Sequence, residues 1–132
     1  MPKSYSGSKG RGKKPPFLGL PKKLLHSEEF ASLSAYEVKI LIDLGAFYNG
    51  SNNGDLCATW SIMGKRGWRS KSTLQNALQG CLDAGFLLKT KQGGQGIGPS
   101  LYALTWEAIN ECGGKLDVKS TTVALNLWRR KN

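Results

Sequence analysis

The sequence contains few of the residues from which metal centres and disulfide frameworks are built. Its 132 residues include a single histidine and three widely spaced cysteines that form no CxxC pair. A structural zinc site needs four converging ligands, usually supplied as two close pairs, so we expect no metal and no cofactor. An odd number of distant cysteines also argues against a disulfide framework. We therefore expect Cys57, Cys81 and Cys112 to be reduced core residues.

Long apolar runs and catalytic motifs are also absent. No stretch approaches the roughly 18 apolar residues of a membrane-spanning helix, and the N-terminus lacks the apolar centre of a secretory signal. We therefore expect a cytoplasmic protein without a membrane partner. The glycine-rich segment 93–98 lacks the Lys-Ser/Thr of a phosphate-binding loop, and no nucleophile–base pairing is evident. This predicts a non-enzymatic protein without a small-molecule substrate.

Acidic residues are scarce, and the basic excess is unevenly distributed. The net charge is +10, with seven basic residues and no acid in residues 1–23 and three more basic residues in 129–131. Between these ends, 24–55 has one Lys against five acids, whereas 56–106 has six basic residues against one acid. A domain with one basic face and two basic ends favours a polyanionic partner, although basic tails can also serve only solubility.

The first strong helix signal begins at Ser34. Its S-A-Y-E sequence fits a capping box, and apolar residues then recur at helical spacing to about Tyr48. A turn-forming run of Asn, Gly and Ser follows, after which 55–58 favours a short strand. We next expect a short helix beginning after Thr59. A second capped helix is predicted over 70–84, where the apolar residues form a single stripe.

A hairpin and a C-terminal extension are predicted to follow. Segments 86–91 and 100–105 favour strands, and the glycine-rich residues between them favour a hairpin tip. After Trp106 we expect a helix of one to two turns ending near Glu111. The remaining pattern is amphipathic and does not distinguish helix from strand. The extension 107–132 is expected either to pack on the domain or to mediate dimerisation.

This order of elements resembles the winged helix-turn-helix class. The resemblance covers 34–105, and its most specific part is Ser70-Lys71-Ser72-Thr73-Leu74 followed by Ala84-Gly85-Phe86-Leu87. More narrowly, the segments 53–56, 70–87 and 100–106 are similar to DNA-binding domains of phage and plasmid replication and regulatory proteins.

The resemblance implies both a fold class and a function. We expect an α+β fold, mainly α, with a three-helix core and a β-hairpin wing over 17–106, preceded by a disordered basic arm over 1–16. The implied function is sequence-specific binding of double-stranded DNA by a nucleoid-associated transcription regulator or by an origin-binding replication protein of a mobile element. Helix-turn-helix proteins often bind DNA as dimers, so a homodimer is a further expectation.

The helix over 70–84 is the expected recognition helix. Its apolar stripe faces the core, which leaves the opposite face for base edges in the major groove, where Gln and Asn amides pair with adenine. The same polar residues could instead form an ordinary solvated helix face. The expected contacts on this helix and the preceding turn are Arg66, Arg69, Ser70, Lys71, Ser72, Gln75, Asn76 and Gln79.

Two further segments carry expected DNA contacts. On the wing, lysines alternate along one strand, and glycines at the tip allow close approach to a phosphate chain. The wing residues are Lys89, Lys91, Gln92 and Gln95. The arm adds affinity through counterion release without reading sequence. Its residues are Lys9, Arg11, Lys13 and Lys14. Either segment could instead be a ligand-free tip or tail.

Several aromatic residues could either pack in the core or contact a ligand or partner. Trp68 is expected to pack beneath the domain or to stack on a base, and Trp128 to close the core or meet a second copy. The alternative function is an RNA-binding or protein-interaction module on the same scaffold. RNA binding favours an exposed aromatic platform, for which the hairpin offers Tyr102 and Phe86, both better explained as core residues.

Overall fold

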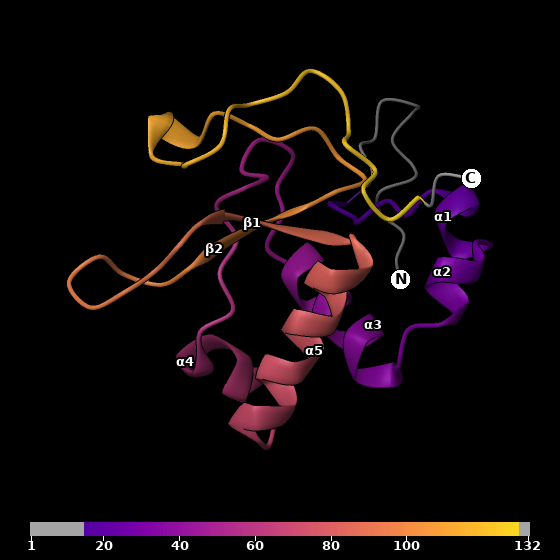
Figure 1. Cartoon of the computed structure of the whole chain (residues 1–132), viewed down its shortest axis with the longest axis horizontal. Helices are drawn as coiled ribbons and strands as arrows, with labels where there is room; N and C mark the ends of the chain where they lie inside the picture. The colour runs from indigo at the N-terminus through magenta and orange to yellow at the C-terminus, as the bar shows by residue number, and fades with distance from the viewer. Residues whose placement is uncertain (1–14, 130–132) are drawn as a thin grey trace.

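The computed structural model describes residues 15–129 (Figure 1). Within them the chain forms an α+β fold in which helices predominate, with five α-helices and a two-stranded antiparallel sheet. None of these helices is long and apolar enough to cross a membrane. In chain order the elements are α1 (Lys22–Leu25), α2 (Glu28–Ala31), α3 (Ala35–Gly45), α4 (Trp60–Met63), the 3₁₀ turn η1 (Gly64–Arg66), α5 (Lys71–Ala84), β1 (Leu87–Lys91), β2 (Leu101–Leu104) and η2 (Cys112–Gly114).

Helix α3 begins where the capping box predicts. The Ser34 hydroxyl accepts the N–H of Glu37 at 3.2 Å, and the Glu37 carboxylate accepts the N–H of Ser34 at 2.8 Å. The helix ends at Gly45, earlier than predicted, and single turns continue to Tyr48. A Cβ at Gly45 would lie 2.5 Å from the Leu18 side chain, so this glycine lets the segment before α1 cross the end of α3 closely.

Helix α5 is defined by both of its ends. Ser70 accepts the N–H of Thr73 at the start, and Gly85 adopts a φ of 85° at the end, as predicted. The predicted apolar stripe packs against α3, and its buried members are Leu74, Ala77, Leu78 and Cys81. The two helices approach closely at Gly80, where the Glu37 side chain occupies the space that a Cβ would take.

The hairpin β1–β2 forms at the predicted place. Its strands are antiparallel, with Leu87 opposite Leu104 and Lys89 opposite Tyr102. The register then shifts between Lys89 and Lys91. Such a bulge bends the strand and changes the side to which the following residues point.

The predicted strand at 55–58 is wrong. Only Leu56 pairs, exchanging two backbone hydrogen bonds with Tyr102 at 3.3 and 2.7 Å. The pairing does not extend toward the N-terminus because the N–H of Asp55 closes a turn onto the Asn52 carbonyl at 2.9 Å. On the other side α4 begins within a few residues.

The predicted helix over 107–111 is also wrong. This segment satisfies its backbone groups through another part of the chain, centred on the fully buried Asn53. The Asn53 amide donates to the carbonyls of Leu104, Glu107 and Ala108 at 2.9, 3.2 and 2.9 Å. These long-range bonds replace the local ladder that a helix would require.

The residues after η2 lie across the hairpin on the side away from α4 and α5 (Figure 1). The N–H of Asp117 donates to the Thr90 carbonyl at 2.8 Å, and the N–H of Asn126 donates to the Thr105 carbonyl at 2.7 Å. Trp128 is buried and joins the main core. The described part of the extension therefore lies on the domain, and dimerisation through it stays a prediction.

The three cysteines are free thiols that differ in burial. Cys81 is buried, whereas Cys57 and Cys112 are only partly buried, so the prediction of three core cysteines holds for Cys81 alone. Burial, with a smaller effect from the charge of Glu37, raises the pKa of Cys81 to about 12. Its thiol, which donates to the Glu37 carbonyl at 3.3 Å, is therefore a protonated packing group at neutral pH.

Candidate nucleic-acid interface

The connection between α4 and α5 presents several cations to solvent. Gly67 turns the chain with a φ of 93°, a left-handed conformation that glycine adopts without steric cost. Lys65, Arg66 and Arg69 are exposed around this turn, whereas Trp68 is 4% exposed. The alternative in which Trp68 stacks on a base is therefore wrong, because its ring belongs to the core.

Asp43 of α3 holds this connection in place. Its buried carboxylate accepts the indole N–H of Trp68 at 2.8 Å and the Nε–H of Arg66 at 3.1 Å. Lys39, one turn earlier on α3, places Nζ 3.1 Å from the same carboxylate and donates to the Arg66 carbonyl at 2.8 Å. Arg66 is thus exposed in part but already engaged by an acid.

The charge state of Asp43 reflects these partners. Burial by itself would raise the pKa of the Asp43 carboxyl. Hydrogen bonds from Trp68, Lys39 and Arg66, together with the charge of Lys39, outweigh burial and hold the pKa below its ordinary value. At neutral pH the carboxylate is therefore ionised and compensates the two cations beside it.

Helix α5 presents its predicted polar face to solvent. Ser70 is half-buried at the cap, with its hydroxyl 3.0 Å from that of Ser72. Gln79 donates to the Asp83 carboxylate at 2.9 Å. Within residues 15–129, the amides of Gln75 and Asn76 have no hydrogen-bond partner, so both are available to a ligand. The exposed members of this face are Lys71, Ser72, Gln75, Asn76 and Gln79.

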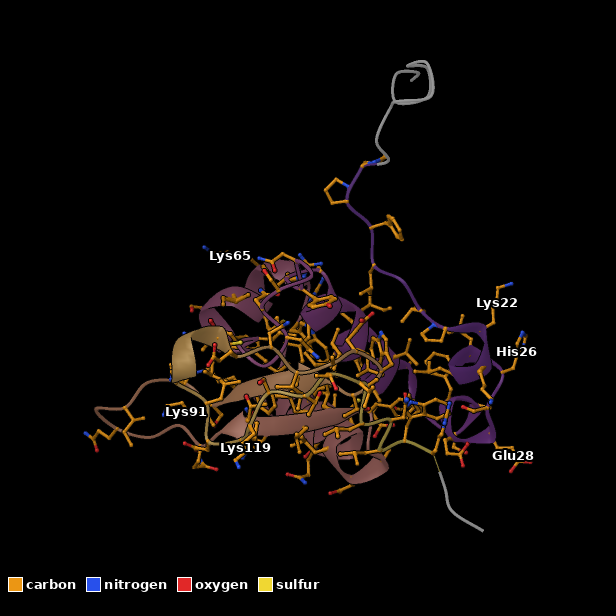
Figure 2. All side chains as sticks on the ribbon, turned by 90° about the horizontal axis from the view of Figure 1, so that it is seen from above. Lys22, His26, Glu28, Lys65, Lys91 and Lys119 are labelled. Atoms are coloured by element: carbon orange, nitrogen blue, oxygen red, sulfur yellow. The ribbon has the colours of Figure 1, made fainter. Side chains whose placement is uncertain are left out.

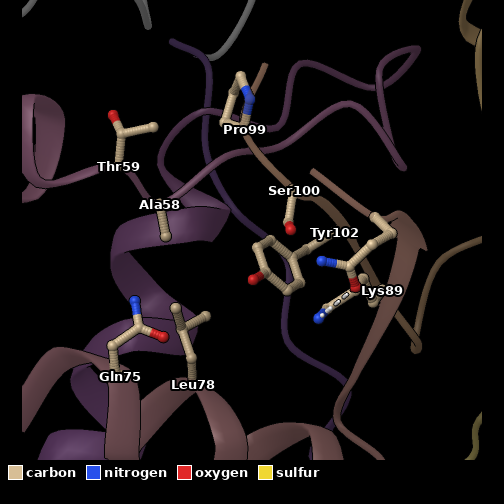
Figure 3. A pocket seen from close by; sticks show the side chains of 9 residues that line it. Ala58, Thr59, Gln75, Leu78, Lys89, Pro99, Ser100 and Tyr102 are labelled. Carbon is tan, nitrogen blue, oxygen red and sulfur yellow. Dashed lines mark hydrogen bonds between the residues drawn. The ribbon is translucent and has the colours of Figure 1, made fainter. Parts of the chain in front are cut away.

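A groove of about 360 Å³ separates α5 from the hairpin. Gln75 and Leu78 form the α5 wall, while Tyr102 and Lys89 face them from the hairpin (Figure 3). Lys89 donates to the Gln92 side chain at 3.1 Å. The lining contains one cation and no acid, and its members are Ala58, Thr59, Gln75, Leu78, Lys89, Gln92, Pro99, Ser100 and Tyr102. An elongated anionic ligand in this groove would contact both elements.

The predicted hairpin contacts do not form one set. Lys89 and Gln92 line the groove, whereas Lys91 lies 3.9 Å from Asp117 of the C-terminal segment. The register shift interrupts the expected alternation, so the two lysines meet different partners. Gln95 is exposed at the tip and does not line the groove.

The predicted contacts of the arm fall outside the described residues. They are Lys9, Arg11, Lys13 and Lys14. Among the described residues, charged side chains lie at two separate ends of the molecule. Lys65 and Lys91 lie toward the hairpin side, whereas Lys22, His26 and Glu28 group at the opposite end (Figure 2).

Sequence reasoning missed several residues of this surface. Lys65 had a signal, because it adjoins Arg66 in a glycine-bracketed turn. Asp43 also had one, since it follows Lys39 by one helical turn within an otherwise apolar run. Thr59 had none, because only the tertiary fold brings it to the groove beside α5. Tyr102 was considered only as a core residue or an RNA platform, and the fold also places it in the groove lining.

No protein family, curated protein or solved structure matches this chain. The interface itself is therefore the guide to function. Its exposed groups are amides, hydroxyls and cations, which can bind a polyanion and also read hydrogen-bonding groups along it. In the described part of the chain, no three His, Cys, Asp or Glu side chains gather as a metal site would require.

Proposed function

We propose that this chain is a sequence-specific, double-stranded DNA-binding protein of the winged helix-turn-helix class, with α5 as the recognition helix and β1–β2 as the wing. The observation that carries the proposal is the groove in which Gln75 of α5 faces Lys89 of the hairpin. One duplex lying along this surface contacts the helix through its bases and the hairpin through its backbone.

The exposed face of α5 supplies the chemistry of base reading. Gln75 and Asn76 lie in the first half of the helix, the part that helix-turn-helix proteins direct at base edges. Their free amides can each donate and accept toward one adenine, which discriminates by about 1–3 kcal/mol per base pair. Lys71, exposed in the first turn, suits a guanine or a phosphate.

The cations around α5 supply affinity that does not depend on sequence. Lys65 and Arg69 are exposed in the connection before α5, and Lys89 stands across the groove. Each phosphate that such a residue neutralises releases counterions, which makes binding weaken as salt increases. The basic N-terminal residues would add to the same effect.

The proposed activity suits two biological roles. A transcription regulator and an origin-binding replication protein of a mobile element both recognise one short duplex among many. A homodimer would recognise two half-sites about one helical turn apart. The protein-to-DNA stoichiometry at saturation distinguishes one bound chain from two.

The test is selection followed by quantitative binding. The full chain is used to select duplexes from a random library, and fluorescence anisotropy then compares a selected duplex, a scrambled duplex and a structured RNA across about 50 to 200 mM salt. We expect a preference of about 10³-fold or more for the selected duplex, retained while scrambled binding falls steeply. Equal binding to all three would contradict the proposal, and preference for RNA would favour the RNA-binding alternative.

A further inference from the structure

Asp43 is a buried acid in a helix that otherwise contributes apolar residues to the core. It is 4% exposed, yet it accepts from three donors on two different segments. Trp68 and Arg66 come from the connection before α5, and Lys39 comes from α3 itself. Burying a carboxylate costs desolvation even with this set of partners, and in some proteins such a group fixes one arrangement over others.

The segment that Asp43 fixes leads directly into α5. Trp68 is two residues before the cap residue Ser70, and its ring also packs against Tyr36 at 5.7 Å. Anchoring Trp68 therefore sets where the connection ends and where the first turn of α5 begins. The exposed Arg69 lies between the anchor and the cap, so its direction depends on the same contact.

Asp43 also decides which cations are available to a ligand. Lys39 and Arg66 both lie within 3.1 Å of its carboxylate, and Lys39 lies beside Gly67 at the turn. While the carboxylate is present, these two cations are compensated. The exposed Lys65 and Arg69 of the connection have no such acid among the described residues.

We propose that Asp43 is a positioning residue that determines the specificity of DNA binding, an inference that rests on the proposed function. It orients the connection and α5 through Trp68, and it withholds Lys39 and Arg66 from nonspecific phosphate contact. Loss of Asp43 therefore loosens the reading of sequence and strengthens binding to any duplex.

The experiment compares Asp43→Asn with Glu28→Gln, which removes the same charge from an exposed side chain near Lys22 and His26 (Figure 2). Anisotropy measures binding of both full-length variants to the selected and scrambled duplexes. For Asp43→Asn we expect the preference to fall about tenfold, an amount typical of one base pair. We also expect tighter scrambled binding, with a log–log salt slope steeper by about 1 to 2. Glu28→Gln should change neither quantity beyond about twofold.

A second variant keeps the charge and removes the anchor. Trp68→Phe deletes the indole N–H that bonds to Asp43 but retains an aromatic ring against Tyr36. We expect Trp68→Phe to lose preference for the selected duplex while its salt slope stays that of the unchanged protein. If circular dichroism shows that Asp43→Asn is unfolded, Trp68→Phe alone tests the proposal. The Asp43 proposal is overturned if the unchanged protein prefers the selected duplex and this preference is equally strong in Trp68→Phe and in every folded Asp43 variant. If the unchanged protein itself does not discriminate, the proposed function falls first.

Discussion

The rings of Phe86 and Trp128 stack with their centroids 5.9 Å apart and their planes within 5° of parallel. Phe86 directly follows the glycine that ends α5, so this contact ties the end of the described chain to the junction of helix and hairpin. The backbone of Leu127 passes so closely over Gly85 that a Cβ there would lie 2.3 Å from the Leu127 carbonyl oxygen. The C-terminal segment therefore joins the domain core through Trp128.

Removing Trp128 should destabilise the whole domain. Trp128→Ala deletes a buried ring from the core, which typically costs about 3–5 kcal/mol of unfolding free energy. Urea denaturation followed by circular dichroism measures this loss. Val123→Ala in the same segment is the control, since Val123 is 67% exposed and should change stability by about 0.5 kcal/mol or less. Equal urea midpoints for the two variants would contradict this account of the segment.

Asn53 should be equally important for a different reason. Asn53→Ala leaves three carbonyls and the N–H of Leu104 without their buried partner, and we expect a loss of about 3 kcal/mol or more. The matched control is Asn52→Ala, whose side chain bonds to exposed backbone and should cost about 1 kcal/mol. A cost at position 53 no greater than at position 52 would be inconsistent with this network.

Local signals correctly predicted the start of α3 and both ends of α5. The capping box at Ser34, the cap at Ser70 and the glycine at the end of α5 all act over a few residues, so a sequence pattern contains them. The strand at 55–58 failed because a turn onto Asn52 and the start of α4 limit the pairing to Leu56. The helix at 107–111 failed because a partner distant in sequence bonds to its backbone. Asn53 bonds across more than 50 residues, and no local pattern encodes that.

The candidate site was predictable to a similar extent. Helical periodicity alone separates the exposed Gln75 and Asn76 from the buried stripe, and the structure agrees. The engagement of Arg66 by Asp43, and of Lys91 by Asp117, required the tertiary fold. A basic residue in a sequence is therefore not necessarily a free cation on the surface.

Stability should depend on pH through Asp43. Its pKa is lowered in the folded state from an ordinary value of 3.8. Its contribution is therefore fully present above about pH 4 and is lost as pH falls through the lower, folded-state pKa. Urea midpoints measured from about pH 6 to pH 2 should show the gap between the unchanged protein and Asp43→Asn narrowing below about pH 4. A difference in urea midpoint that stays constant over this pH range would contradict a lowered pKa for Asp43.

The basic arm should contribute affinity without specificity. Deleting residues 2–14 removes five basic residues, and the log–log salt slope should become shallower by about 0.9 for each phosphate that the arm neutralises. Binding to selected and scrambled duplexes should weaken by similar factors, as measured by anisotropy. A decrease confined to the selected duplex would mean instead that the arm reads sequence.

In the proposed complex, α5 reads DNA sequence through its exposed amides. The most direct measurement is the affinity of Gln75→Ala combined with Asn76→Ala for the selected and scrambled duplexes at one salt concentration. Because both side chains are exposed, the variant should remain folded, lose about 1–3 kcal/mol of preference per amide, and bind scrambled DNA as before. Full retention of the preference would contradict the assignment of α5 as the recognition helix.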